Sequence, residues 1–225
     1  MEYSAFSGMI NDVVSLEVDE NSVVSIDETV HFNKKVRITA ANGSSIYLRG
    51  KSIVESESSL ICRDSSKMNI CDSRISWRSH LMFICNSELI MEKDSLLQGL
   101  SEMFGLQGRI VIGAQTTIAR CSEIRCHFSS IEIGKDNMFS QFVKMVAGDG
   151  HKIFDSDGNL ITHKECIKTG EHVWLGMGAC LLSGSDVGSG SIVGAQSLVN
   201  KVIPPNAIAA GNPAKVLREG IRWER

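Results

Sequence analysis

A six-residue repeat runs through residues 175–203 and constrains the fold more strongly than any other feature of the chain. An aliphatic residue returns at every sixth position: Leu175, Leu181, Val187, Val193 and Val199. Four positions after each aliphatic residue, the chain carries Ala179, Ser185, Ser191, Ser197 and Ile203. A period of six matches neither the 3.6-residue period of a helix nor the two-residue alternation of a strand. It indicates a repeat architecture.

Each six-residue unit is explained by a short strand followed by a bend. The aliphatic side chain points to an interior that only a stacked neighbouring coil closes. Glycine after three of the five aliphatics (Gly176, Gly188 and Gly194) lets the backbone turn without Cβ strain. Small residues fit where neighbouring corners crowd. The repeat therefore predicts an all-β solenoid whose winding hides every strand edge except the two at its ends.

The same step extends less regularly into the rest of the chain. In the N-terminal half one register contains Val24, Val30, Val36, Leu48, Val54, Leu60, Ile84, Ile90 and Leu96. Because the small fifth residue is mostly missing there, we expect irregular coils over residues 1–108 and regular coils over residues 109–203. Residues 204–225 leave the repeat at Pro204 and are expected to form a helical or extended cap. A chain of 225 residues with three prolines favours a single elongated domain.

Bulk properties disfavour several classes of function. A formal net charge of −3 argues against general nucleic-acid binding. The acidic, non-apolar N-terminus predicts neither a signal peptide nor a membrane span, so we expect a cytoplasmic protein. Seven cysteines without metal-ligand spacing are expected to be reduced, mostly buried thiols, and no metal is expected. Five basic residues against two acidic ones in residues 201–225 favour either a small anionic ligand or a solvated surface.

The repeat breaks between Met145 and Leu175, where loop-forming residues replace the aliphatic residues at every sixth position. Gly148-Asp149-Gly150-His151 and the run from Asp155 to Asn159 are typical of turns. We expect a protruding loop near residues 148–170. Long irregular excursions from a regular scaffold are where functional groups concentrate, so His151 is the first candidate for a reactive side chain.

Three motifs carry a resemblance to a known family. They are Asp-Gly-His-Lys-Ile-Phe-Asp around His151, His-Val-Trp-Leu-Gly at 172–176, and Ala-Gly-Asn-Pro-Ala-Lys-Val at 210–216. With the hexapeptide pattern, they resemble the hexapeptide-repeat acyltransferases, and most closely the galactoside, capsule polysaccharide and polysialic acid O-acetyltransferases. The run at 221–225 is most similar to the polysialic acid branch. The resemblance implies a left-handed parallel β-helix, a homotrimer with sites between subunits, and acetyl transfer from acetyl-CoA to a hydroxyl of a glycan.

The resemblance also implies roles for single residues. His151 matches the catalytic histidine, and the type suits a general base because its pKa lies near neutrality. Trp174 matches the tryptophan of the catalytic site that lines the acetyl-CoA channel. The other expected acetyl-CoA contacts are Met177, Ala195, Asn200, Lys201, Lys215 and Arg218. Met177, Ala195, Asn200 and Lys201 are expected on one outer line of the solenoid. Asn137 is expected to face the acceptor, and Asp149 and Asp155 are expected either to orient His151 or to contact the acceptor. For each of the three a plain turn role is an equal alternative.

Rival functions stay open at this point. The same machinery could N-acetylate an amino sugar, although the Gly-rich phosphate loop of a nucleotide-binding domain is missing. A non-catalytic scaffold would leave the set of His151, Trp174 and Lys201 unexplained. A γ-carbonic anhydrase would need several zinc-spaced histidines, which His127, His151 and His163 do not form. The acceptor sugar is not specified by the sequence.

Overall fold

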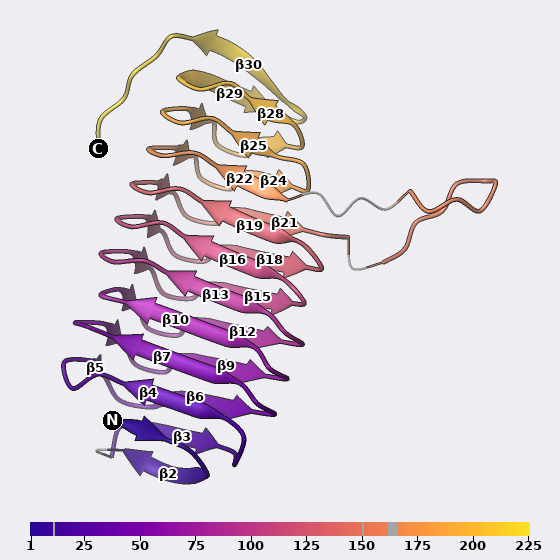
Figure 1. Cartoon of the computed structure of the whole chain (residues 1–225). Coiled ribbons are helices and arrows are strands. Elements are labelled where there is room, and N and C mark those ends of the chain that lie inside the picture. Colours follow the sequence, from indigo (N-terminus) through magenta and orange to yellow (C-terminus); the bar gives the residue numbers. More distant parts are fainter. Residues whose placement is uncertain (11, 150, 162–165) are drawn as a thin grey trace.

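The computed structural model describes residues 1–10, 12–149, 151–161 and 166–225. The described chain winds as an all-β solenoid with three sheets of ten strands each (Figure 1). Within each sheet, strands of successive coils stack from the N-terminal end to the C-terminal end, and they run parallel except at the two ends. This is the left-handed parallel β-helix that the resemblance implies. No helix of the described chain is long and apolar enough to cross a membrane.

The three sheets, named A, B and C, form the three faces of a prism. Sheet A contains β1 (Glu2–Tyr3), β4 (Val23–Ile26), β7 (Ser45–Arg49), β10 (Lys67–Cys71), β13 (Glu88–Met91), β16 (Arg109–Ile112), β19 (Ser130–Ile133), β22 (Ile167–Thr169), β25 (Asp186–Val187) and β28 (Val202–Ile203). Sheet B contains β2 (Phe6–Ile10), β3 (Val14–Val18), β6 (Val36–Ala41), β9 (Ser59–Arg63), β12 (His80–Ile84), β15 (Glu102–Leu106), β18 (Glu123–His127), β21 (Lys144–Ala147), β24 (Cys180–Leu182) and β27 (Leu198–Val199). Sheet C contains β5 (His31–Phe32), β8 (Ile53–Val54), β11 (Arg74–Ile75), β14 (Leu96–Leu97), β17 (Thr117–Ile118), β20 (Met138–Phe139), β23 (Trp174–Leu175), β26 (Ile192–Val193), β29 (Ala207–Gly211) and β30 (Ala214–Glu219).

The prism has three edges, which we name by the sheets that they join. The chain crosses the A/C edge after each strand of sheet A, then the C/B edge, then the B/A edge, and starts the next coil. Each edge is a column of corners stacked along the solenoid. Residues 148–166 separate β21 from β22, and we name this segment the excursion. Its described residues 148–149 and 151–161 leave from the B/A edge and project away from the prism (Figure 1).

Coil length changes along the chain, which corrects the expected N-terminal register. Paired residues are 22 positions apart between Val14 and Val36 and 21 apart between Leu96 and Thr117, but 18 apart between Trp174 and Ile192. The six-residue register is right for Leu48, Val54 and Leu60, which are buried. It is wrong for Ile84, Ile90 and Leu96, which are half-buried outside the core, because three or four extra residues in each coil shift the phase. Phe83, Leu89 and Leu97 point inward instead.

The core combines stacked aliphatics with buried hydroxyl groups at the corners. All five aliphatics of the C-terminal repeat are buried, as expected. Apart from Thr39 and Thr169, which lie within strands, the buried polar residues follow the three edges: Ser52, Ser73, Ser95, Thr116, Asn137 and Ser191 on A/C; Ser58, Ser79, Ser101, Ser122 and Ser197 on C/B; and Ser22, Ser44, Ser66, Ser87 and Ser185 on B/A. Several of their side-chain oxygens accept an N–H group of the next coil, as between Ser44 N and Ser22 Oγ at 3.1 Å and between Ser87 N and Ser66 Oγ at 3.0 Å. The coils from Val14 to Ala147 therefore repeat with a period of 21 or 22 residues.

Both ends of the solenoid are closed by antiparallel strands. At the N-terminal end β1 pairs with β4 and β2 with β3. At the C-terminal end β29 turns back into β30, so the cap takes its extended form and no helical turn is described there. Antiparallel closure covers strand edges that would otherwise offer free N–H and C=O groups. All seven cysteines are free thiols, but only Cys62 and Cys126 are buried, fewer than expected.

Candidate active site

The excursion is held to the solenoid at its base. Gly148 has φ of +83°, and its N–H donates to Ser183 Oγ at 2.8 Å. A Cβ at this position would lie 1.9 Å from the carbonyl oxygen of His127, so the close approach requires glycine. Asp149 and His151 follow directly and are exposed. The base therefore sets where the chain that carries His151 leaves the B/A edge.

The outer part of the excursion is a small antiparallel hairpin, and Asp155 lies in its turn. Phe154 bridges Leu160, and the Asp155 carboxylate accepts the N–H groups of Asp157 and Asn159 at 3.0 and 2.8 Å. The hydrogen bond from the side chain of Asn159, followed by its backbone N–H, lowers the pKa of Asp155. Both carboxylate oxygens are engaged inside the turn. The structure thus supports the turn role for Asp155.

Trp174 lies on the outer side of sheet C. It starts β23, while Leu175 beside it is buried in the core, so alternation along the strand turns the indole outward. Its Nε1 donates to Ser140 Oγ on the preceding coil at 3.3 Å. The indole is half-buried, because Trp223 packs beside it with ring centroids 5.9 Å apart. A large aromatic side chain is thus fixed on the surface rather than in the core.

The four residues expected on one outer line occupy two edges of the prism. Met177 and Ala195 lie at equivalent corners of the C/B edge, where Gln196 N donates to Met177 O at 2.9 Å. Asn200 and Lys201 lie at the B/A edge, beyond β27. The expectation of one line is wrong because six residues span one side of the triangle, so residues five apart reach different corners. All four are exposed.

The basic pair of the cap lies on the outermost strand. In β30, Lys215 pairs with Ala210 and Arg218 with Ile208, and both side chains are exposed. They stand at the C-terminal end of sheet C, beyond Trp174 and Ile192 of the same sheet. A ligand that passes Trp174 toward this end would meet their charges.

The position of Asn137 differs from the acceptor contact that was one expectation for it. Its side chain is fully buried. The amide nitrogen donates to the carbonyl oxygens of Gly134 and Gly170 at 2.8 and 3.0 Å, and the amide oxygen accepts Val173 N at 2.6 Å. Both the amide nitrogen and the amide oxygen of Asn137 are hydrogen-bonded inside the A/C edge, so the side chain does not face an acceptor. It joins the two coils that the excursion separates in sequence.

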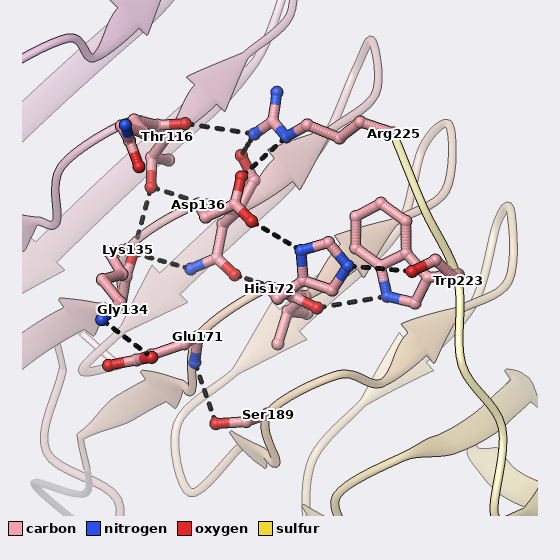
Figure 2. A network of polar contacts seen from close by, with 12 residues as sticks. Thr116, Gly134, Lys135, Asp136, Glu171, His172, Ser189, Trp223 and Arg225 are labelled. Carbon is pink, nitrogen blue, oxygen red and sulfur yellow. Dashed lines mark hydrogen bonds and ion pairs between the residues drawn. The ribbon is translucent and has the colours of Figure 1, made fainter.

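A network on the A/C edge contains the site residues that the sequence did not reveal (Figure 2). His172 Nδ1 bonds to Asp136 Oδ2 at 2.6 Å, and Nε2 bonds to Trp223 O at 3.1 Å. The Trp223 carbonyl, and then Asp136, raise the pKa of His172. Arg225 donates to Asp136 Oδ1 at 2.9 Å. The sequence motif at 172–176 includes His172 but gives it no role, and the signal that points to its partners is the aromatic and basic run at 221–225.

His151 and Trp174 do not share an edge within one chain. The excursion leaves the B/A edge, whereas sheet C, which carries Trp174, lies between the A/C and C/B edges. Sheets A and B separate the two positions around the prism. Within one chain, the two residues therefore stand at different places around the prism.

Comparison with known proteins shows what this chain is similar to. No family model matches the sequence. The polysialic acid O-acetyltransferase of Escherichia coli O1:K1 is 33% identical over 137 residues, which are 60% of this chain and 44% of that protein. A crystal structure of the polysialic-acid-specific acetyltransferase NeuO superimposes with a TM-score of 0.74 and 26% identity, covering 96% of this chain and 84% of that one. The chain is similar to the hexapeptide-repeat acyltransferases in sequence and in fold.

Two further proteins are similar to this chain, one in fold and one in sequence. The polysialic acid O-acetyltransferase OatWY shares the fold with a TM-score of 0.63 and 22% identity, over 95% of this chain and 92% of that one. WbbJ of Escherichia coli K12, a putative lipopolysaccharide biosynthesis O-acetyl transferase, is 30% identical over 116 residues, 44% of this chain and 59% of that protein. The chain spans less than half the length of the first curated relatives that it matches.

Proposed function

We propose that this acyltransferase moves an acetyl group from acetyl-CoA to a hydroxyl of a bacterial surface glycan. One observation carries the proposal. A chain similar to NeuO over nearly its whole length has its regular coils interrupted once, and the interruption presents an exposed histidine, His151. The curated relatives named for polysialic acid and lipopolysaccharide favour a sugar hydroxyl as acceptor.

The chemistry requires no covalent intermediate on the protein. The His151 imidazole takes the proton of the acceptor hydroxyl as its oxygen attacks the thioester carbonyl. The tetrahedral intermediate then collapses, the C–S bond breaks, and the CoA sulfur leaves with the proton that His151 returns. Trp174 forms an aromatic wall for the thioester arm. Backbone groups near Gly176 are candidates to stabilise the oxyanion.

We propose a homotrimer whose active sites lie between copies. The separation of His151 and Trp174 around the prism supports this arrangement, because one copy supplies the histidine and its neighbour supplies the aromatic wall. The same logic accounts for the remaining acetyl-CoA contacts. Met177 and Ala195 on the C/B edge would face Asn200 and Lys201 on the B/A edge of the adjacent copy. Lys215 and Arg218 would meet the phosphates of CoA.

Acetyl transfer by purified variants tests the proposal. His151→Ala is expected to lower kcat by about 10²–10⁴-fold, the loss that follows removal of a general base. His31→Ala is the matched control, because His31 is an exposed histidine of an N-terminal coil, and it should keep full activity. Near-normal kcat in His151→Ala would overturn the role of His151. Absence of acetyl transfer by the wild type to every glycan offered would favour a scaffold.

The acceptor is identified by a panel of glycans that includes polysialic acid. A mass gain of one acetyl group that mild alkali removes indicates an ester, and an alkali-stable gain indicates an amide on an amino sugar. A cytoplasmic location fits the proposal, because seven free thiols are typical of reducing compartments. Asp149 beside His151 is the remaining candidate for an acceptor contact.

A further inference from the structure

The segment 221–225 follows the A/C edge back along the solenoid, away from β30. Ile221 N donates to Asn206 O at 2.9 Å, on the last coil. Trp223 lies against His172 on an earlier coil, and Arg225 reaches Asp136 and Gln115 on the two coils before that (Figure 2). The residues that receive the segment share one corner position, since Gln115, Asp136, His172 and Asn206 all have φ between 54° and 61°. The segment thus binds a ready-made column rather than an irregular surface.

Arg225 anchors the far end of this segment. Its guanidinium donates to Asp136 Oδ1 at 2.9 Å, to Asn137 O at 2.6 Å, to Gln115 O at 3.1 Å and to Thr117 Oγ1 at 3.4 Å. The planar group is therefore gripped from several directions by one carboxylate, two carbonyls and a hydroxyl. Its side chain is 37% exposed, so the anchor combines charge-assisted bonding with partial burial.

Trp223 lies in the middle of the segment, and both its indole ring and its backbone carbonyl contact His172. Its indole stacks on His172 with ring centroids 3.9 Å apart and 13° between the planes. Its Nε1 donates to His172 O at 3.1 Å, and its own carbonyl accepts from His172 Nε2 at 3.1 Å. The other neighbour of this indole is Trp174, at 5.9 Å. The segment therefore places a second aromatic ring beside the indole that the proposed function assigns to the acetyl-CoA channel.

We propose that residues 221–225 are a clamp that sets the position of Trp174, with Trp223 as the positioning residue and Arg225 as its anchor. The inference rests on the proposed function in one respect, namely that Trp174 contacts acetyl-CoA. Trp223 closes one side of Trp174, and Ser140 holds the indole nitrogen. Without the clamp Trp174 gains rotational freedom, and acetyl-CoA must order it on binding. The entropic cost of ordering Trp174 therefore weakens the binding of acetyl-CoA and leaves the rate of the chemical step unchanged.

Steady-state kinetics of two variant pairs tests the clamp. Trp223→Ala is expected to raise KM for acetyl-CoA about 3- to 10-fold, the range for loss of one aromatic contact, with kcat changed by less than about twofold. Trp223→Phe retains the stack and should recover most of the affinity. Trp77→Phe, at the C/B edge of an early coil, is the aromatic control and should leave KM unchanged. Equal KM values for Trp223→Ala and the wild type would overturn the proposal.

The second pair separates anchoring from the aromatic contact. Arg225→Ala should raise KM as Trp223→Ala does. Arg222→Ala should not, because Arg222 is 85% exposed and pairs with Glu224 of the same segment. In the Trp77→Phe/Trp223→Phe background Trp174 is the single indole, and Arg225→Ala should move its emission to longer wavelength. An unmoved emission in that background also overturns the clamp.

Direct binding distinguishes failure of the clamp from failure of the proposed reaction. Calorimetric titration with CoA needs no acceptor and no turnover. If no glycan is acetylated but CoA binds the wild type more tightly than Trp223→Ala by the same factor, the clamp stands and the reaction fails. If glycans are acetylated and both proteins bind CoA equally, the reaction stands and the clamp fails. Melting temperatures of all variants within a few degrees of the wild type confirm that folded proteins are compared.

Discussion

The imidazole of His172 is bonded through both nitrogens, to the Asp136 carboxylate at 2.6 Å and to the Trp223 carbonyl at 3.1 Å. Both partners only accept hydrogen bonds, so each nitrogen must carry a proton, and the geometry selects the imidazolium form. A neutral imidazole has one N–H and would leave one of the two contacts without a hydrogen.

Docking of segment 221–225 is therefore expected to depend on pH. The Trp223 carbonyl and then Asp136 raise the pKa of His172 above its ordinary value of 6.5. A raised pKa in the docked state means that the stabilisation is complete below about pH 6.5 and is lost as pH rises through the raised value. Hydrogen exchange of the amides of residues 221–225, measured from about pH 5.5 to 9 and corrected for intrinsic rates, should show protection falling with pH. His172→Gln should make the protection independent of pH, and a wild-type profile without pH dependence contradicts the prediction.

Asn137→Ala should destabilise the whole solenoid. The substitution leaves the buried Val173 N–H and the Gly134 and Gly170 carbonyls without their side-chain partner. An unsatisfied buried group costs about 1–3 kcal/mol, so we expect a loss of more than about 2 kcal/mol in the free energy of unfolding. Urea denaturation measures it. Asn69→Ala, on the outer side of β10, is the control and should change stability by less than about 0.5 kcal/mol. Similar losses in both variants would show that Asn137 is not a joint between coils.

The base of the excursion should tolerate no side chain at Gly148. Gly148 and Gly158 both have φ of +83°, but a Cβ at Gly148 meets the His127 carbonyl oxygen, whereas a Cβ at Gly158 meets nothing within 4 Å. Alanine at either position bears the same backbone strain. Gly148→Ala should therefore lose about 1–3 kcal/mol more stability than Gly158→Ala, and it should lower acetyl transfer about 10- to 100-fold by displacing His151. Thermal melts and initial rates compare the two, and equal effects would contradict the steric argument.

Subunit mixing tests whether the site lies between copies. His151→Ala and Trp174→Ala should each be inactive alone. In oligomers formed from equal amounts of both, a site that takes His151 from one copy and Trp174 from the next is intact in about a quarter of cases. Co-expression of the two differently tagged chains should therefore restore about a quarter of wild-type activity. If mixed oligomers form but stay inactive, both residues act from the same copy.

Much of the architecture is predictable from local pattern. The six-residue return of Leu175, Leu181 and Val187 predicts inward-facing strands of a solenoid, because the repeat fixes which side of each short strand is apolar. The same local reasoning draws attention to His151, since the periodic marks disappear around it. The expected buried aliphatics and the all-β fold are confirmed by the structure.

The phase of the N-terminal coils is present in the sequence, but in the spacing of its serines rather than in a six-residue register. Serines recur at 22, 44, 66 and 87, and again at 58, 79, 101 and 122, in steps of 21 or 22 residues. A fixed six-residue register cannot follow a coil of that length, so it fails at Ile84, Ile90 and Leu96. The hydroxyl columns mark the period of these coils, because hydroxyl oxygens such as those of Ser22 and Ser66 accept the N–H group of the equivalent corner of the next coil, from Ser44 and Ser87.

The sequence by itself determined the repeat, the inward aliphatics and the position of the one long interruption, because each depends on residues close together in the chain. Tertiary structure alone decided which residues share an edge. Asn200 and Lys201 separate from Met177 and Ala195 because a corner intervenes, and Asn137 is buried because two coils 36 positions apart in sequence close over it. His172 meets Trp223 across 51 positions, and Arg225 meets Gln115 across 110. No local pattern encodes such contacts, since they exist only once the coils have stacked and the segment 221–225 has folded back along their edge.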